Sequence, residues 1–191
     1  MKITIIGAGN IGRGLAGVLS TAGHDVVTAD QGDDLAAAVE RAETVILATP
    51  YGAAASIAAA ADFDGKIVID VSNPITEDFS GLQLGFDTSA AEEIAKLLPG
   101  ASVVKAFNTI FAGHYAEGLK IEGRALQALV ASDDAAAKAA VTRLATDIGL
   151  MPIDAGPLKN ARYLEPLGFM NIQFGFVLGL GGGVAPHWLG A

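Results

Sequence analysis

ITIIGAGNIG, residues 3–12, joins a β-branched apolar run to a glycine-rich turn, and an apolar-periodic segment follows as far as Ala22. Glycine-rich hexapeptides occur by chance, but one that follows a strand pattern and opens a helix pattern predicts a dinucleotide-binding turn. The alternative is a structural strand–turn–helix that binds nothing. The position favours a dinucleotide site, whose residues are Gly7, Ala8, Gly9, Asn10, Ile11 and Gly12.

Each glycine of this turn has its own physical reason. Gly7 permits the tight turn from strand to helix, and Gly9 removes a side chain that would keep the backbone away from a pyrophosphate. Gly12 lets the helix pack closely on the strand. The free N–H groups and the positive dipole end of the helix then face the phosphates.

Composition excludes several classes of protein. The 191 residues include 12 basic and 21 acidic residues, for a net charge of −9, and no Lys or Arg cluster. Nucleic acid and anionic membranes are therefore poor partners. Without cysteine there are no disulfides, thiolate metal sites or cysteine nucleophiles. No apolar run reaches the roughly 18 residues of a membrane span, and no signal-like segment opens the chain, so we expect a cytoplasmic protein.

Short β-branched runs alternate with alanine-rich helical stretches. We expect strands at residues 3–6, 25–29, 44–48, 66–71, 102–107, 126–131 and 151–153. We expect helices at 11–22, 33–41, 53–61, 90–98 and 134–148, an irregular stretch at 108–123, and a helical tail at 159–180 that Pro166 bends or divides. This alternation predicts an α/β fold with a doubly wound parallel sheet, the Rossmann NAD(P)-binding fold. We expect residues 1–155 to form the dinucleotide-binding domain and residues 156–191 to form a short C-terminal helical extension of it.

Small polar residues and prolines recur where the predicted strands end. They are Thr49 and Pro50 after the third strand, Asn73 and Pro74 after the fourth, and Asn108 and Thr109 after the fifth. Ligands of open parallel sheets bind beyond the carboxyl ends of the strands. We therefore interpret these residues as the floor of a ligand site, with donors and acceptors for a nicotinamide carboxamide. For any single residue, ordinary turn chemistry is the alternative.

Asp30 follows the second predicted strand, 18 residues after Gly12 (30 − 12). An acidic residue there accepts hydrogen bonds from the adenine ribose and repels a 2′-phosphate. Gln31-Gly32-Asp33-Asp34, which follows, offers no cation. This pattern favours NAD over NADP, although Arg13 could reach a phosphate and leaves NADP open. The alternative role for Asp30 is to cap the next helix.

The sequence shows no obvious acid–base machinery. Of the three histidines, only His114 lies near the predicted cleft, and it is a weak candidate for a catalytic acid. No Ser-His-Asp order, carboxylate pair or His-x-x-x-His spacing is present, so we expect no metal site and name no other catalytic residue. A cofactor site without proton-transfer groups suits hydride transfer between two bound cofactors.

Three segments resemble the coenzyme F420-dependent NADP oxidoreductase family: GAGNIGRGLA at 7–16, VVKAFNT at 103–109 and DAGPLKNARYLEP at 154–166. The resemblance implies a Rossmann domain with a small helical C-terminal part, which transfers hydride between nicotinamide C4 and C5 of a stacked deazaflavin. It implies that the polar residues and prolines at the strand ends surround both rings. Related oxidoreductase domains occur in membrane metalloreductases. Because the family's tail commonly takes part in subunit contacts, residues 167–180 are a candidate homodimer surface; simple packing onto the sheet is the alternative.

Two departures from the family pattern concern the ligands. Members that use NADP typically carry Ser-Arg or similar after the second strand and often Thr between the first two glycines, where this chain has Ala29-Asp30 and Ala8. The deazaflavin carries a phosphate and a glutamate tail, for which the nearest cations here are Lys105, Lys159 and Arg162. A flavin or another small hydride acceptor is therefore an alternative to F420.

We predict an NAD(P)-dependent oxidoreductase that transfers hydride between a nicotinamide dinucleotide and F420 or a flavin-like acceptor. One alternative is a non-catalytic NAD(P)-binding module that senses redox state. Another is a reductase of a small imine or ketone, against which the missing all-helical substrate domain and the absent acid–base pair both count.

Overall fold

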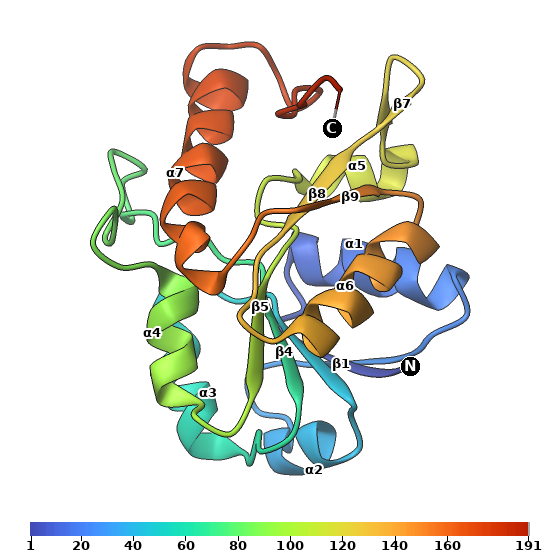
Figure 1. The fold of residues 1–191 in the computed structure, drawn as a ribbon, viewed down its shortest axis with the longest axis vertical. Coiled ribbons are helices and arrows are strands. Elements are labelled where there is room, and N and C mark those ends of the chain that lie inside the picture. The colour runs from blue at the N-terminus through green and yellow to red at the C-terminus, as the bar shows by residue number, and fades with distance from the viewer. Residues whose placement is uncertain (191) are drawn as a thin grey trace.

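A five-stranded parallel sheet forms the centre of the protein, with the strand order β2-β1-β3-β4-β5 (Figure 1). The computed structural model describes residues 1–190, so Ala191, the last residue of the predicted extension, lies outside the described residues. The chain leaves β1 for β2 on one side and returns to β3 on the other, which confirms the predicted doubly wound sheet. The strands are β1 (Lys2–Ile6), β2 (Asp25–Ala29), β3 (Thr44–Leu47), β4 (Ile67–Asp70) and β5 (Ser102–Lys105).

Helices cover both faces of this sheet. One apolar cluster contains Leu15, Tyr115 and Leu144, from α1, α5 and α6. A second contains Val39 and Ile57 of α2 and α3, together with residues of α4. Strands buried on both sides must be apolar throughout, which explains their continuous β-branched runs. The helix bounds are α1 (Asn10–Thr21), α2 (Leu35–Glu40), α3 (Ala54–Ala60), α4 (Ala90–Leu97), α5 (Ala112–Glu117) and α6 (Ala135–Asp147).

The chain after β5 differs from the regular alternation. The predicted irregular stretch 108–123 contains α5 and leads into a small hairpin, β6 (Lys120–Ile121) with β7 (Arg124–Ala125). The last two strands, β8 (Gln127–Val130) and β9 (Met151–Asp154), form a separate parallel pair. This pair is joined to the main sheet through an antiparallel bridge between Lys105 and Ala131.

The C-terminal helix α7 (Ala161–Ile172) starts near α4 and extends away from the sheet (Figure 1). The expectation that Pro166 could divide the helix is wrong, because Pro166 lies inside α7. A π-helical turn, Gln173–Val177, follows, so the helical tail ends before Leu180. The remaining chain is irregular and returns to β8, where the side chain of Gln127 pairs with the backbone of Trp188. Among residues 1–190, no helix has both the length and the apolar character needed to cross a membrane.

Candidate functional site

Two glycines of the Gly7–Gly12 turn lie where no side chain fits. Gly7 has φ = +109°, and a Cβ there would lie 2.5 Å from the carbonyl oxygen of Ala48 at the end of β3. A Cβ on Gly12 would lie 1.8 Å from the carbonyl oxygen of Gly7. The turn therefore depends on glycine at both positions for its conformation and for the close packing of α1 on the sheet.

Gly9 lies at the N-terminus of α1, and it is not crowded. A Cβ there would meet nothing within 4 Å. Gly9 is the N-cap residue, and no side chain caps the helix, so the first N–H groups of this 12-residue helix have no side-chain acceptor. Free N–H groups at the positive end of a helix dipole, next to open space, fit a diphosphate.

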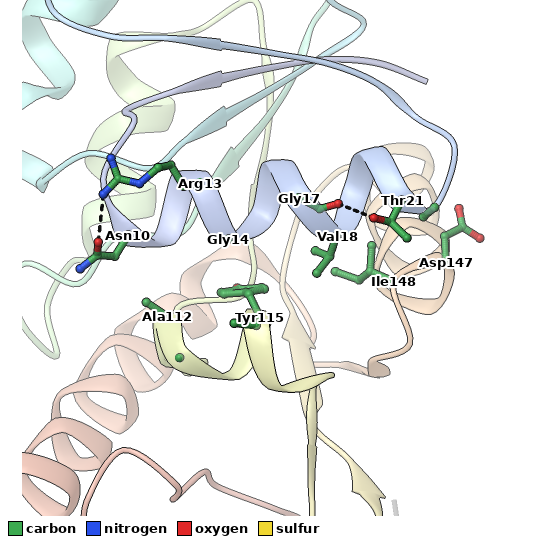
Figure 2. A pocket seen from close by; sticks show the side chains of 13 residues that line it. Asn10, Arg13, Gly14, Gly17, Val18, Thr21, Ala112, Tyr115, Asp147 and Ile148 are labelled. Atoms are coloured by element: carbon green, nitrogen blue, oxygen red, sulfur yellow. Dashed lines mark hydrogen bonds between the residues drawn. The ribbon is translucent and has the colours of Figure 1, made fainter.

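Arg13 is the cation nearest to this turn in sequence, and its Nη2 donates to Asn10 Oδ1 over 3.1 Å. Figure 2 shows this pair at one end of a groove of about 880 Å³ between α1 and α5. Tyr115 packs on the bare backbone of Gly14 along the groove. The groove therefore lies beside the glycine turn, and Asn10 of the turn lines its end together with Arg13.

A cleft of about 440 Å³ lies where β1, β2 and β3 end. It brings together four residues that the sequence predicts for the site, namely Gly7, Asp30, Thr49 and Pro50. Gln31, Gly32 and Asp33 complete the side that follows β2. Within the described chain, no Lys or Arg lines this cleft. Its polar wall is therefore acidic.

Asp30 does not cap the following helix, which was the alternative role predicted for it. Asp34 is the N-cap of α2, since its Oδ1 accepts from the backbone N–H of Ala37 over 3.0 Å. The carboxylate of Asp30 accepts from the backbone N–H of Gln31 over 2.8 Å, and the Asp30 N–H donates to Asp33 Oδ2 over 2.7 Å. These two bonds stiffen the loop and hold two carboxylates at the cleft.

The polar residues at the ends of β4 and β5 bind one another. Asn108 Nδ2 donates to Asn73 Oδ1 and Asn73 Nδ2 donates to the Asn108 carbonyl oxygen, both over 2.9 Å. Asn108 Nδ2 also donates to the carbonyl oxygen of Leu164 in α7 over 2.8 Å. Asn171 Nδ2 donates to the Thr109 carbonyl oxygen over 3.2 Å. The predicted floor residues therefore also attach α7 to the sheet.

Two polar atoms at these strand ends have no hydrogen-bond partner among residues 1–190. Ser72 Oγ and Asn108 Oδ1 are buried without a hydrogen bond, on residues that are each 8% exposed. An orphaned buried polar atom costs free energy unless a ligand or water satisfies it. Both atoms could pair with the carboxamide of a nicotinamide ring.

A buried ionic cluster, which sequence reasoning missed, lies next to the amide pair. Lys105 Nζ donates to Asp70 Oδ2 over 2.7 Å, to Glu165 Oε1 over 2.9 Å and to the Ser72 carbonyl oxygen over 2.5 Å. Since Lys105 is 0% exposed, it cannot bind the charged tail of a ligand, as the sequence had suggested. A lysine inside the apolar run VVKAF was the available signal.

Glu165 joins this cluster to a third element. Its carboxylate also accepts from the backbone N–H groups of Ala90 and Ala91, over 2.9 and 3.2 Å, at the start of α4. Burial raises the pKa of Glu165, and the neighbouring Lys105 opposes that rise. Arg162, another predicted ligand-binding cation, instead pairs with Glu92 of α4 through two hydrogen bonds of 2.7 and 2.8 Å.

His114 lies under the C-terminal segment. Its side chain is 1% exposed, and Nε2 is 3.3 Å from the carbonyl oxygen of Val184. Its ring stacks against Phe111, with ring centroids 6.2 Å apart. In this position His114 attaches the C-terminal segment to α5 and presents no open face to a substrate.

A doubly wound parallel sheet, a glycine turn at the N-terminus of α1 and a cleft beyond the strand ends define a Rossmann-type dinucleotide-binding protein. The family described as NADP oxidoreductase, coenzyme F420-dependent, matches residues 2–38 and 32–74. The chain belongs to this family of NADP-dependent oxidoreductases.

Three individual proteins are similar to this chain over most of its length. A crystal structure from Arthrobacter sp. FB24, proposed to be an F420-dependent NADP reductase, is 27% identical over 91% of this chain and 92% of that chain, with a TM-score of 0.83. A hypothetical protein of Sinorhizobium meliloti is 31% identical over 83% of this chain and 86% of that chain, with a TM-score of 0.74. The metalloreductase STEAP3 of Rattus norvegicus is 33% identical over 87% of this chain. The match spans 36% of the length of STEAP3.

Proposed function

We propose that this protein transfers hydride from a reduced nicotinamide dinucleotide to F420 or a flavin-like acceptor. The observation that carries the proposal is the uncapped N-terminus of α1, with open space at Gly9 beyond the ends of β1 and β3. The family description, which names both NADP and F420, supports the choice of the two cofactors.

In this proposal, a different group of the protein binds each part of the nucleotide. Backbone N–H groups of the turn Gly7–Gly12 hold the diphosphate, and Asp30 accepts from the adenine ribose. Thr49 and Pro50 form the wall between the two halves. The nicotinamide end lies at Asn73, Pro74, Asn108 and Thr109, where Ser72 Oγ and Asn108 Oδ1 lack partners.

The bound nicotinamide ring would supply the hydride. The protein's part is to hold donor and acceptor rings in contact, because proximity and orientation account for much of the rate of such a step. The reduced acceptor ring takes up a proton at N1, which water can supply, so no residue is required to move it. The burial of His114 agrees with this, since a group that is 1% exposed has no path to a substrate.

We also propose that NADH is preferred to NADPH, against the family description. Asp30 and Asp33 lie where a 2′-phosphate would bind, and no cation of the described chain lines that cleft. A phosphate there would face two carboxylates at close range without compensation. The residues present fit a ribose with free hydroxyl groups and do not fit its 2′-phosphate ester.

The C-terminal extension, residues 156–191 beside the nucleotide domain 1–155, has two roles in this proposal. Its first part, α7, closes the ends of β4 and β5. Its second part carries the C-terminal apolar surface, through which two copies form a homodimer. We define this surface as the exposed residues Phe174, Phe176, Val177, Leu178 and Leu180, which are 41–65% exposed.

The test follows the absorbance of reduced nicotinamide while FMN, F420 or a ferric chelate is offered as the acceptor. The ferric chelate is included because the STEAP relatives are named metalloreductases. Protein-dependent loss of the NADH band with FMN or F420 would support the proposal. Tight binding of NADH without turnover on any acceptor would instead favour a redox sensor.

A further inference from the structure

Helix α7 meets the ends of β4 and β5 at a point where no side chain fits. A Cβ on Gly168 would lie 2.6 Å from Asn73 Oδ1 and 2.9 Å from the Asn108 carbonyl oxygen. One turn earlier, the Leu164 carbonyl oxygen accepts from Asn108 Nδ2 over 2.8 Å. The position of α7 therefore fixes the position of both amide side chains.

Glu165, the residue after Leu164, attaches this part of α7 to β5 and to α4. Its carboxylate accepts from Lys105 Nζ of β5 and from two backbone N–H groups of α4. Lys105 Nζ in turn binds the carbonyl oxygen of Ser72, the residue before Asn73. One buried network thus connects α7 to both strand ends that carry the amide pair.

Attaching α7 through this network costs free energy of desolvation. Two carboxylates and one ammonium group, on residues no more than 1% exposed, lose their hydration. Apolar side chains of similar volume often stabilise a protein as well or better, so the cluster is weak evidence for added stability. Its hydrogen bonds do define one position of α7 relative to β5 and α4. The geometry maintained here includes Ser72 Oγ and Asn108 Oδ1, the two polar atoms without partners.

We infer that Glu165 is a positioning residue for the nicotinamide half of the dinucleotide. By fixing α7, it holds the Asn73–Asn108 pair so that the unpaired oxygens meet the carboxamide. The inference rests on the proposed function, which places nicotinamide at the ends of β4 and β5. The diphosphate turn and Asp30 lie at the ends of β1 and β2 and make no hydrogen bond to this network. Loss of Glu165 should therefore weaken binding of only one half of the ligand.

The experiment compares NAD⁺ with ADP-ribose, which lacks the nicotinamide ring, by calorimetric titration of the full chain. For Glu165→Gln we expect the Kd of NAD⁺ to rise about tenfold relative to wild type, while that of ADP-ribose changes less than about twofold. Glu92→Gln is the matched control, because it makes the same change at the partly exposed Arg162 pair between α4 and α7. It should leave the ratio of the two Kd values unchanged.

Three results would overturn the inference. The first is an equal loss of both affinities in Glu165→Gln, which is the mark of a merely structural role. The second is wild-type protein that binds ADP-ribose as tightly as NAD⁺, since nicotinamide would then contribute nothing. The third, no binding of NAD⁺, NADP⁺ or ADP-ribose, would overturn the proposed function itself. Glu165→Asp makes the same comparison if Glu165→Gln does not fold.

Discussion

Gly9 differs from Gly7 and Gly12 in that its missing side chain would point into open space. Its φ of −69° and ψ of −174° are also open to any residue. Glycine at this position is therefore not required for folding, and the proposed function gives it a reason, the close approach of a diphosphate to the bare backbone. The open space at Gly9 therefore favours a nucleotide-binding turn over a purely structural one.

Gly9→Val should remain folded and lose nucleotide. We expect the Kd of NADH to rise at least about a hundredfold, or about 2.8 kcal/mol, because the valine side chain would occupy the diphosphate position. Gly17→Val is the control, since Gly17 also has nothing within 4 Å of its Cβ but lies in the middle of α1. Calorimetry on both variants, with circular dichroism for folding, checks the result. Full affinity in a folded Gly9→Val protein would contradict the placement of the diphosphate.

Asp30 determines the choice of nucleotide if it meets the adenine ribose. Asp30→Ser combined with Gln31→Arg removes a carboxylate from the cleft and adds a guanidinium that can bind a 2′-phosphate. We expect the affinity ratio of NADPH to NADH to rise at least about tenfold. Glu77→Arg makes the same change of two charge units at an exposed loop residue and should leave the ratio unchanged. A constant ratio in the double variant would mean that Asp30 never meets the ribose.

The helices and strands that local sequence patterns encode are the ones that could be predicted. The strands β1 to β5 and the helices between them are predicted from continuous apolar runs and helical periodicity. It failed for α5, a six-residue helix that contains Gly113 and packs on α1 through Tyr115 and Gly14. Such a short helix is stabilised by tertiary packing more than by its own sequence.

The candidate site likewise contains features encoded by local sequence and features that depend on tertiary contacts. The turn at Gly7–Gly12 and the acidic loop at Asp30 are contiguous in sequence, so both could be predicted as nucleotide-binding segments from local patterns. The contact of Lys105 with Glu165 joins residues 60 positions apart, and it depends on how α7 returns to the sheet. No local pattern encodes that return. The sequence therefore predicted the strand-end residues but not the helix that binds them.

The contact between α4 and α7 should depend on pH through Glu92. Its hydrogen bonds with Arg162 are the main reason that the pKa of Glu92 lies below the ordinary value of 4.5. Because the folded-state pKa is the lower one, ionised Glu92 stabilises the folded chain above pH 4.5, and this contribution disappears as pH falls through the lower value. Wild type should therefore be more stable than Glu92→Gln at pH 7, by about 1 kcal/mol or less because both side chains are partly exposed.

Urea unfolding of both proteins at pH 7 and pH 3 measures this difference. The free energies of unfolding should converge at the lower pH, where Glu92 begins to bind a proton. A difference that stays constant between the two pH values would show that the ion pair makes no pH-dependent contribution. Glu43→Gln serves as a control carboxyl group outside the α4–α7 contact.

Charged and apolar residues are unevenly distributed over the protein. The chain has a net charge of −9, which opposes non-specific association. The C-terminal apolar surface nevertheless lies at the end of α7 that is farthest from the sheet (Figure 1). Within residues 167–180, Gly168 and Asn171 pack against the ends of β4 and β5, whereas the residues of the C-terminal apolar surface are exposed, so only that surface remains available for the predicted homodimer. Contiguous apolar residues exposed in this way are typical of interfaces.

One charge added to the C-terminal apolar surface of each copy should disrupt a homodimer that forms through this surface. Leu178, which is 62% exposed, would lie beside its own copy or a neighbour from the surface in a two-fold interface. Leu178→Glu should therefore convert the dimer to monomer, because it places a buried, unpaired carboxylate in each copy. Sedimentation equilibrium should give twice 19.3 kDa for wild type and 19.3 kDa for the variant. Leu97→Glu, at an exposed leucine on α4, should remain dimeric. Wild type that sediments as a monomer, or Leu178→Glu that stays dimeric, would remove the C-terminal apolar surface as the interface.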